Sequence, residues 1–537
     1  MPTLAIDGKQ VTVPDGTTLL QACEQAGSPV PFYCYHPGLS IAGNCRICLV
    51  EIEKMPKLQI ACYLRAADGM VVHTTSDEVL KGRQEVLEFL LINHPLDCPV
   101  CDQAGECWLQ DYYMEYGLYN PKFDEQKVKK PKAIPIGPHV MLDAERCILC
   151  SRCVRFCDEI TKTGEFGIFN RADHSEIGIY PGKQLDNNYS GCVVDICPVG
   201  ALTDRDFRFK CRVWYLGSTK SVCPGCAMGC NIEIHDNRER TARPHIAQGA
   251  RVMRLKPRYN PDVNQWWMCD EGRYGYKFID ERRIINVQLR TNGTARQATW
   301  DEALDLVAQT FLRLTEKNQQ DRIGVILSTH LTNEDLYVAK RVFQELGIQN
   351  LTVQGPARPG SSDNFLIKAD KSPNTRGVQA LGLSFESAKV LEQAARKELS
   401  VLYVFGHDLV DVYGEEAVKA AVASLELVVF QGSNINRSCE VAHVIFPSAV
   451  YAEKDGTFTN CQDRVQRLYQ AFPPLGDAKP DWQILLEFAK RLGLPLNFLD
   501  AESIFKSLAT LEPAFQGLSY ELIGDHGALL KSGEVAQ

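Results

Sequence analysis

The sequence predicts a multidomain protein of mixed α+β and α/β structure, with a cysteine-rich first half and an α/β second half. Eighteen of its 21 cysteines lie before residue 231, and most of them fall into sets of four. In the second half, short apolar runs alternate with amphipathic stretches, a pattern typical of βαβ units around a largely parallel sheet. A chain of 537 residues with 45% hydrophobic content is long enough for three or four domains, each with its own core.

Composition and charge exclude several functions. A net charge of −9 argues against nucleic acid as the main partner, because phosphate binding requires a basic face. The N-terminus has no apolar signal region, and the longest strongly apolar stretch, VLEFLLI at 86–92, is far shorter than a membrane span. We therefore expect a soluble, cytoplasmic protein whose cysteines bind metal rather than form disulfides. Neither G-x-G-x-x-G nor G-x-x-x-x-G-K-[ST] occurs, so no nucleotide site is predicted.

Residues 1–78 are predicted to form a small β-grasp domain. The runs at 3–7 and 10–13 predict a hairpin, and 17–26 predicts a helix with Cys23 as a buried core thiol.

A loop rich in glycine and proline follows this helix and carries the first ligand set. Its members are Cys34, Cys45, Cys48 and Cys62. The arrangement is similar to that of plant-type ferredoxins, which hold a 2Fe-2S cluster, but ten residues separate the first two cysteines where the plant pattern has four. A structural zinc site is the alternative for the same residue types.

The second set lies in a predicted helical region, residues 79–120. Ser76 is the expected N-cap of a helix that runs to about Asn93, and Pro95 ends it. The loop beyond carries one histidine and three cysteines at ligand spacing: His94, Cys98, Cys101 and Cys107. We expect all four to ligate a 4Fe-4S cluster, in which the imidazole in place of a thiolate removes one negative charge and changes the reduction potential. The following segment, 121–138, is predicted to be a linker whose lysines at 127, 129, 130 and 132 form a solvated run, although a subunit contact is an alternative.

A 4Fe-4S ferredoxin-like domain is predicted over residues 138–215. Its expected ligands are Cys147, Cys150, Cys153 and Cys197, the last followed by proline as in bacterial two-cluster ferredoxins. A second cluster of that type would need cysteines at 187, 190 and 193, where the chain has Asn, Ser and Val. We therefore expect Cys157, Cys192 and Cys211 to be buried thiols rather than ligands.

The fourth set is predicted over residues 216–275. Its members are Cys223, Cys226, Cys230 and Cys269. A third 4Fe-4S cluster is the favoured interpretation, and a zinc ribbon is the alternative.

Residues 276–500 are predicted to form an α/β domain, followed by a C-terminal tail at 501–537. Strands are expected at 324–328, 401–406 and 427–432, with a helix at 415–424 between the last two. Thr332 and Asp335 predict a capping box for a helix that ends at Leu346.

Four segments of the first half closely resemble the large iron-sulfur subunit of respiratory complex I, the NADH-quinone oxidoreductase. They are CYHPGLSIAGNCRICLVE, HPLDCPVCDQAGECWLQD, RCILCSRCVRFCDE and DICPVGALTD, in this order. The resemblance implies one 2Fe-2S and three 4Fe-4S clusters, with the first three on the main electron path and the fourth standing off it.

The second half resembles the molybdopterin oxidoreductases, such as formate dehydrogenase. WDEALDLVAQ and AEKDGTFTNCQDRVQ carry this likeness. We expect the domain that closes over the pterin to be missing after about residue 500, and no cysteine lies between Cys269 and Cys439 to ligate molybdenum. We expect a degenerate domain that binds no molybdopterin and serves as a scaffold, with Cys439 and Cys461 as core thiols.

The resemblance implies an electron-transfer subunit of the peripheral arm, relaying electrons from the NADH/FMN-binding subunit towards quinone (ubiquinone or another type) in a proton-translocating respiratory chain complex. No catalytic residue or substrate site is expected on this chain. Its partners would be that subunit and others of the peripheral arm, at the cytoplasmic face of the inner membrane, with membrane association only through the complex. Two alternatives are an electron-transfer subunit of an NAD-reducing hydrogenase and a formate dehydrogenase catalytic subunit. The long second half argues against the former, and the missing molybdenum ligand against the latter.

Overall fold

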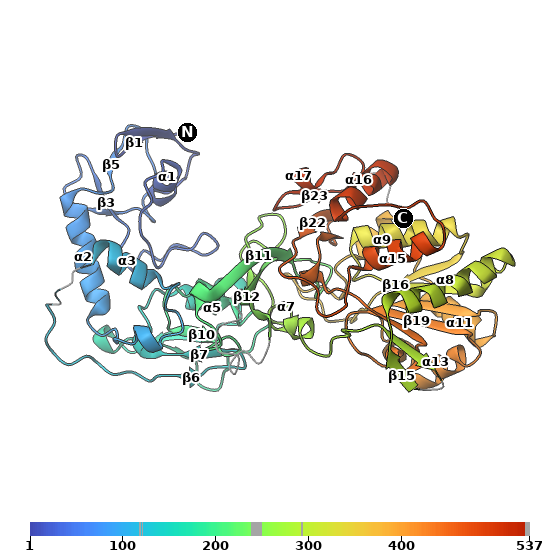
Figure 1. Ribbon diagram of the computed structural model, residues 1–537. Coiled ribbons are helices and arrows are strands. Elements are labelled where there is room, and N and C mark those ends of the chain that lie inside the picture. Colours follow the sequence, from blue (N-terminus) through green and yellow to red (C-terminus); the bar gives the residue numbers. More distant parts are fainter. Residues whose placement is uncertain (118–119, 121, 238–249, 292–293, 532–537) are drawn as a thin grey trace. The chain divides into compact units, whose positions relative to one another are not determined.

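Figure 1 shows the computed structural model, which describes residues 1–117, 120, 122–237, 250–291 and 294–531. Contacts divide the described chain into two compact units. Unit 1 contains Met1–Leu216, and unit 2 contains Gly217–Asn237 and residues 250–531.

Unit 1 begins with a five-stranded sheet of order β2-β1-β5-β3-β4. The elements are β1 (Thr3–Ile6), β2 (Lys9–Thr12), α1 (Leu19–Gln25), β3 (Leu49–Ile52), β4 (Gln59–Ile60) and β5 (Val71–His73). The predicted hairpin is confirmed, since β1 pairs antiparallel with β2, and β1 also pairs parallel with β5. The hydroxyl of Thr18 accepts the N–H of Gln21 and begins α1, which buries Cys23 completely, as predicted.

The rest of unit 1 is built from short elements. They are α2 (Asp77–Leu91), α3 (Trp108–Tyr116), β6 (Ile134–Pro135), β7 (Val140–Leu142), α4 (Arg152–Arg155), β8 (Phe166–Phe169), β9 (Glu176–Ile179), α5 (Cys192–Ile196) and β10 (Leu202–Asp204). Strands β10, β7 and β6 form one antiparallel sheet, and β8 pairs with β9. Ser76 caps α2, as predicted, because its hydroxyl accepts the N–H of Val79.

The described part of the predicted linker, residues 122–138, differs from the solvated run that its composition predicts. Lys127 Nζ donates hydrogen bonds to the carbonyls of Leu91 and Ile92, at 2.9 and 2.7 Å. Lys132 Nζ lies 2.8 Å from a carboxylate oxygen of Glu145. The prediction was wrong for Lys127 because the last carbonyls of α2 lack partners within the helix and need donors from elsewhere. It was wrong for Lys132 because that side chain pairs with the buried carboxylate of Glu145.

Unit 2 contains a three-stranded sheet, β11-β12-β13, a seven-stranded sheet, β15-β14-β20-β19-β18-β16-β17, and a small sheet, β21-β22-β23. Its strands are β11 (Leu216–Val222), β12 (Asn231–Asn237), β13 (Val252–Pro257), β14 (Gln288–Thr291), β15 (Thr294–Gln297), β16 (Ile323–Ser328), β17 (Asn350–Gln354), β18 (Val401–Phe405), β19 (Leu427–Gly432), β20 (Val444–Pro447), β21 (Gly456–Thr459), β22 (Arg464–Leu468) and β23 (Ala528–Leu529). Its helices are α7 (Asp270–Tyr274), α8 (Trp300–Glu316), α9 (Asn333–Glu345), α10 (Thr375–Ala380), α11 (Ser387–Ala395), α12 (Leu409–Tyr413), α13 (Glu415–Val422), α14 (Ser438–Val441), α15 (Asp481–Arg491), α16 (Ala501–Leu511) and α17 (Tyr520–Ile523).

The seven-stranded sheet has the predicted βαβ character. Strands β17, β16, β18, β19 and β20 are parallel, and α13 connects β18 to β19. The predicted capping box is also present, since Thr332 and Asp335 each accept the other's backbone N–H at 3.1 Å.

Helices cover both faces of this sheet. Along β16, Val325 and Leu327 face a core shared with α8, α9, α15 and α16, whereas Ile326 faces a core shared with α11 and α13. Residues 501–530 belong to the first of these cores, because Ile504 and Phe515 are fully buried in it.

At the carboxyl ends of the parallel strands, the sheet opens into a crevice lined by Ser328, Gly432 and Ser448, among others. Open α/β sheets bind ligands at this edge. Here Lys454, which also lines the crevice, lies 2.6 Å from Asp335 and 2.7 Å from Asp481. All three side chains are at most 4% exposed, so the crevice contains a buried ion-pair network.

Candidate iron-sulfur sites

The first ligand set lies on the loop between α1 and β3 and on the turn after β4. Its four thiols, those of Cys34, Cys45, Cys48 and Cys62, are all buried. The Cys34 N–H donates to Cys45 Sγ over 3.4 Å. Hydrogen bonds involving Cys45 and Cys62 lower the pKa of the Cys34 thiol, and one involving Cys62 lowers the pKa of Cys48. The structure thus brings the predicted set together in one hydrogen-bonded group, despite the ten-residue gap.

The second set lies on the loop between α2 and α3. Cys98 begins a 3₁₀ turn (Cys98–Val100), and Cys107 immediately precedes α3. Burial lowers the pKa of His94 to about 4, and the positive charges of Arg146 and Lys127 act in the same direction. His94 is therefore neutral at neutral pH, which is the form of imidazole that binds metals.

Shared neighbours connect His94 with the cysteines of its set. Burial raises the pKa of Cys101, and the charge of Arg146 opposes this rise. The charge of Arg146 therefore affects the pKa of both Cys101 and His94. The charge of the Cys98 thiolate in turn raises the pKa of the Cys101 and Cys107 thiols. Gly200 lies against this group, because a Cβ there would meet Cys101 Sγ at 2.2 Å. Only glycine leaves room for the thiol at this position.

The third set encloses a single cavity in unit 1. The cavity is lined by Cys147, Cys150, Cys153 and Cys197, and its remaining walls are mostly apolar, with Leu142, Ile148, Ile177, Val199, Ala201 and Leu202. Burial raises the pKa of Cys147 and of Cys197 to about 12, and the nearby Cys150 thiol acts in the same direction on both. Such thiols ionise when a metal stabilises the thiolate, so the cavity suits a positively charged inorganic group.

The backbone of the third set is folded tightly around its cavity. Leu149 and Ser151 adopt left-handed conformations, with φ of 54° and 61°. The Leu149 N–H donates to Cys147 Sγ over 3.4 Å. Non-glycine residues adopt this conformation at an energetic cost, and functional sites are where such strain concentrates. Hydrogen bonds to ligand sulfurs are one of the features that set cluster potential.

Two arginines that the sequence analysis missed connect the third set to the first. Arg152 is 2% exposed and donates to the carbonyls of Ile196, at 3.0 Å, and Tyr35. Arg155 Nη2 donates to the carbonyls of Cys34, at 2.5 Å, and Cys150, at 3.3 Å. The signal available in the sequence was the pair of arginines inside SRCVRFC, but its long-range partners cannot be read from spacing.

The three extra cysteines of unit 1 do not line the cavity of the third set. Cys157, Cys192 and Cys211 are all buried, as predicted. Burial, followed by the charge of Glu165, raises the pKa of the Cys157 thiol. In unit 2, Cys439 is buried as predicted, but Cys461 is exposed. The prediction of a core thiol was wrong for Cys461 because it lies in the tight turn between β21 and β22.

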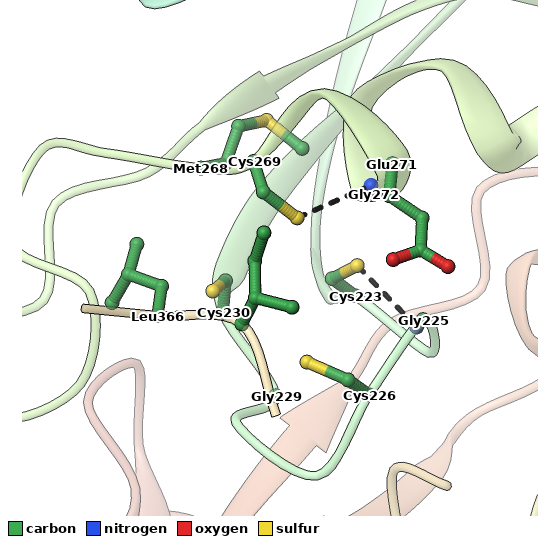
Figure 2. A pocket seen from close by; sticks show the side chains of 11 residues that line it. Cys223, Gly225, Cys226, Gly229, Cys230, Met268, Cys269, Glu271, Gly272 and Leu366 are labelled. Atoms are coloured by element: carbon green, nitrogen blue, oxygen red, sulfur yellow. Dashed lines mark hydrogen bonds between the residues drawn. The ribbon is translucent and has the colours of Figure 1, made fainter. Parts of the chain in front are cut away.

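The fourth set lies in unit 2. Figure 2 shows the thiols of Cys223, Cys226, Cys230 and Cys269 around a common pocket. The N–H of Gly225 donates to Cys223 Sγ over 3.5 Å, and the N–H of Gly272 donates to Cys269 Sγ over 3.4 Å.

Glycine and apolar side chains complete this pocket. A Cβ at Gly272 would come within 2.9 Å of Cys223 Sγ, so glycine keeps the space beside the thiol open. Leu366 and Ile367, from the segment between β17 and α10, form part of the wall. Glu271, which also lines the pocket, accepts hydrogen bonds from Lys371 Nζ at 2.7 Å and from Arg358 at 2.8 Å.

The three sets of unit 1 share one hydrophobic cluster. It contains Cys34 and Cys45 of the first set, Cys107 of the second and Cys150 of the third, packed with Tyr33, Ile47, Leu87, Leu109, Ile148, Val199 and Ala201. Packed side chains, and not solvent, therefore fill the space between these ligands of the three sets.

The donor chemistry of the four sets fits iron-sulfur clusters. Such clusters take thiolate ligands and, in some cases, histidine, and their potentials respond to burial and to hydrogen bonds at sulfur. Within the described ranges, no group of three or more His, Cys, Asp or Glu side chains is arranged to hold a metal ion directly. The sites are defined by the cavities that their thiols line and by their shared contacts. No helix in the described part of the chain is long and apolar enough to cross a membrane.

Family models match successive parts of the chain. A 2Fe-2S iron-sulfur cluster binding domain matches residues 1–77, an NADH-ubiquinone oxidoreductase-G iron-sulfur binding region matches 83–122, and the ferredoxin-like domain of NADH-quinone oxidoreductase subunit 3 matches 137–203. The molybdopterin oxidoreductase Fe4S4 domain matches 216–281, and molybdopterin oxidoreductase matches 276–375 and 372–491. Fold and sites together define an iron-sulfur oxidoreductase component with a multidomain α+β and α/β architecture.

Similar proteins define the family. The G subunit of NADH-quinone oxidoreductase from Rickettsia bellii is 31% identical over 96% of this chain and 90% of its own length. The mitochondrial 78 kDa subunit of NADH-ubiquinone oxidoreductase from Candida albicans is 30% identical over 95% of this chain and 85% of its own. The chain belongs to the family of these complex I subunits.

Two solved structures are more distant. An NAD⁺-reducing [NiFe]-hydrogenase matches with 29% identity and a TM-score of 0.36, over 40% of this chain and 91% of its own. Acetylene hydratase from Pelobacter acetylenicus matches with 10% identity and a TM-score of 0.40, over 58% of this chain and 74% of its own.

Proposed function

We propose that this chain relays electrons through iron-sulfur clusters in the peripheral arm of NADH-quinone oxidoreductase. The observation that best supports this proposal is that three ligand sets share one hydrophobic cluster in unit 1. The chain also belongs to a family of complex I subunits. The hydrogenase and formate dehydrogenase alternatives have no comparable support, because the relatives that match most of the chain are complex I subunits.

We assign one cluster to each ligand set. Cys34, Cys45, Cys48 and Cys62 would hold a 2Fe-2S cluster. Three 4Fe-4S clusters would be held by His94, Cys98, Cys101 and Cys107, by Cys147, Cys150, Cys153 and Cys197, and by Cys223, Cys226, Cys230 and Cys269. The first set is supported by its shared hydrogen bonds, and the third and fourth by their thiol-lined cavities.

Iron-sulfur clusters exchange single electrons without forming or breaking bonds in the protein. The residues of this chain hold the clusters, exclude water from them and adjust their potentials. Apolar walls such as Leu142 and Ile177 keep the third site dry, and the Leu149 N–H aimed at Cys147 Sγ favours added negative charge there. Neutral His94 contributes one negative charge fewer than a thiolate would.

The proposal requires partner subunits. The chain contains neither nucleotide motif, so another subunit must hold NADH and its flavin, and another must hold quinone. We place the chain at the cytoplasmic face of the inner membrane, bound through the complex. The domain boundaries that we propose are 1–78, 79–120, 138–215, 216–275 and 276–500, followed by a C-terminal segment, 501–537, whose residues 501–530 pack into the core of the α/β domain. The α/β part would bind no molybdopterin.

Metal analysis of the anaerobically purified full chain tests the assignment. The ligand sets predict about 14 iron atoms per chain and neither zinc nor molybdenum. Cys226→Ala should lower the iron content by about four atoms, because it removes a ligand of the fourth set only. Stoichiometric zinc with iron near ten would contradict the fourth assignment, and molybdenum at one per chain would contradict the scaffold role of the α/β part.

A further inference from the structure

Arg155 contacts a ligand residue of the first set and a ligand residue of the third set. Its Nη2 atom donates to the carbonyl of Cys34 at 2.5 Å and to that of Cys150 at 3.3 Å. Its Nη1 atom donates to the carbonyl of Ser40, and its Nε atom donates to Ser151 Oγ at 3.2 Å. The side chain thus joins the two loops that carry these ligands.

Further hydrogen bonds connect the loop of the first set with residues 149–159. Asn44 Nδ2 donates to the Leu149 carbonyl at 3.0 Å, and the Ser40 N–H donates to Glu159 Oε2 at 2.8 Å. Neither bond involves a ligand cysteine. Arg155, by contrast, reaches the carbonyl of a ligand residue on each of the two loops.

The hydrogen bonds of Arg155 also place its positive charge beside both ligand sets, at the carbonyls of Cys34 and Cys150. A positive charge at this position stabilises a cluster that carries one more electron, because reduction adds negative charge next to it.

We propose that Arg155 is a positioning residue shared by the first and third clusters: it fixes their ligand loops against each other and raises both reduction potentials. The proposal rests on the cluster assignments made above. When either cluster is reduced by one electron, no covalent bond of Arg155 forms or breaks.

Two substitutions separate the charge of Arg155 from its geometry. Arg155→Met removes both, so both midpoints should fall, each by up to about 59 mV, which corresponds to a tenfold change in the equilibrium constant for one electron. Arg155→Lys keeps the charge but cannot donate from a planar fork to both carbonyls. Its midpoints should stay close to those of the wild type, while the amides of residues 34–45 exchange hydrogen about tenfold faster.

The measurements are redox titration followed by electron paramagnetic resonance and hydrogen exchange, both on the cluster-loaded full chain. Cys48→Ser and Cys153→Ser first assign the two signals. Arg205→Met is the matched control, because Arg205 donates to the carbonyl of Gly137 at 2.8 Å and contacts no ligand residue in the described hydrogen bonds. It should leave midpoints and exchange unchanged.

The outcomes distinguish the proposal from its premise. If Cys48→Ser and Cys153→Ser remove no signal, the cluster assignments fail. If they remove the expected signals and Arg155→Met shifts neither midpoint, or only one, the shared role of Arg155 is wrong. If Arg155→Met loses iron, Arg155→Lys becomes the deciding variant. Amide hydrogen exchange at residues 34–45 that is as slow in Arg155→Lys as in the wild type would then overturn the proposal.

Discussion

The two units of this chain position ligand thiols in different ways. In unit 1, three sets lie on loops between short elements, some ligands of each set pack in one hydrophobic cluster, and Arg155 bonds ligand residues of two sets. In unit 2, one set lies beside a seven-stranded sheet covered by helices on both faces. The three sets of unit 1 therefore share a hydrophobic cluster separate from the core of its N-terminal sheet, whereas unit 2 has large apolar cores on both faces of its sheet.

The largest expected effect is in the scaffold of unit 2. Lys454→Met leaves Asp335 and Asp481 without their buried cation, although both carboxyls are at most 4% exposed. Removing one partner of a buried ion-pair network costs about 3–5 kcal/mol. Denaturant unfolding should show that loss in unit 2, with the iron signals of unit 1 unchanged.

Lys419→Met is the control for this substitution. Lys419 pairs with Glu415 on the surface, and both side chains are about two-thirds exposed, so no measurable change is expected. Equal stability of Lys454→Met and the wild type would show that the buried network does not support the α/β scaffold.

A smaller effect is expected in the shared cluster of unit 1. Leu109 is 3% exposed in that cluster, and Leu109→Ala should cost about 3 kcal/mol through lost burial and the cavity left behind. Because the cluster includes ligands of all three sets, their signals should be lost together in denaturant titrations.

Leu96→Ala, at a 91% exposed position of unit 1, should change neither stability nor signals. Loss of one signal well before the other two in Leu109→Ala would show that the three sites are held independently.

Local features of the fold could be predicted from the sequence because their causes are local. Ser76 caps α2, and Thr332 caps α9 through its box with Asp335, since capping depends on residues three positions apart. The parallel strands β18 and β19 with α13 between them follow from apolar runs and helical periodicity. The thiols that line the cavities of the third and fourth sets follow from cysteine spacing.

The features missed depend on residues far apart in the chain. Arg155 lies 121 residues from Cys34, so no spacing rule reveals its hydrogen bond. Lys127 was expected in a charged linker, yet it caps α2 at positions 35 and 36 residues away. The resemblance to the molybdopterin oxidoreductases predicted Cys461 to be a core thiol, but a turn exposes it.

Electron flow in the assembled complex tests the central claim, that the three sites of unit 1 form the relay and the fourth stands apart. Cys153→Ser removes a ligand of the third set, and Cys226→Ser removes one of the fourth. The rate from NADH to quinone should be nearly lost in Cys153→Ser and largely retained in Cys226→Ser, once iron analysis confirms comparable cluster loss. Flow that survives Cys153→Ser but stops in Cys226→Ser would contradict the account.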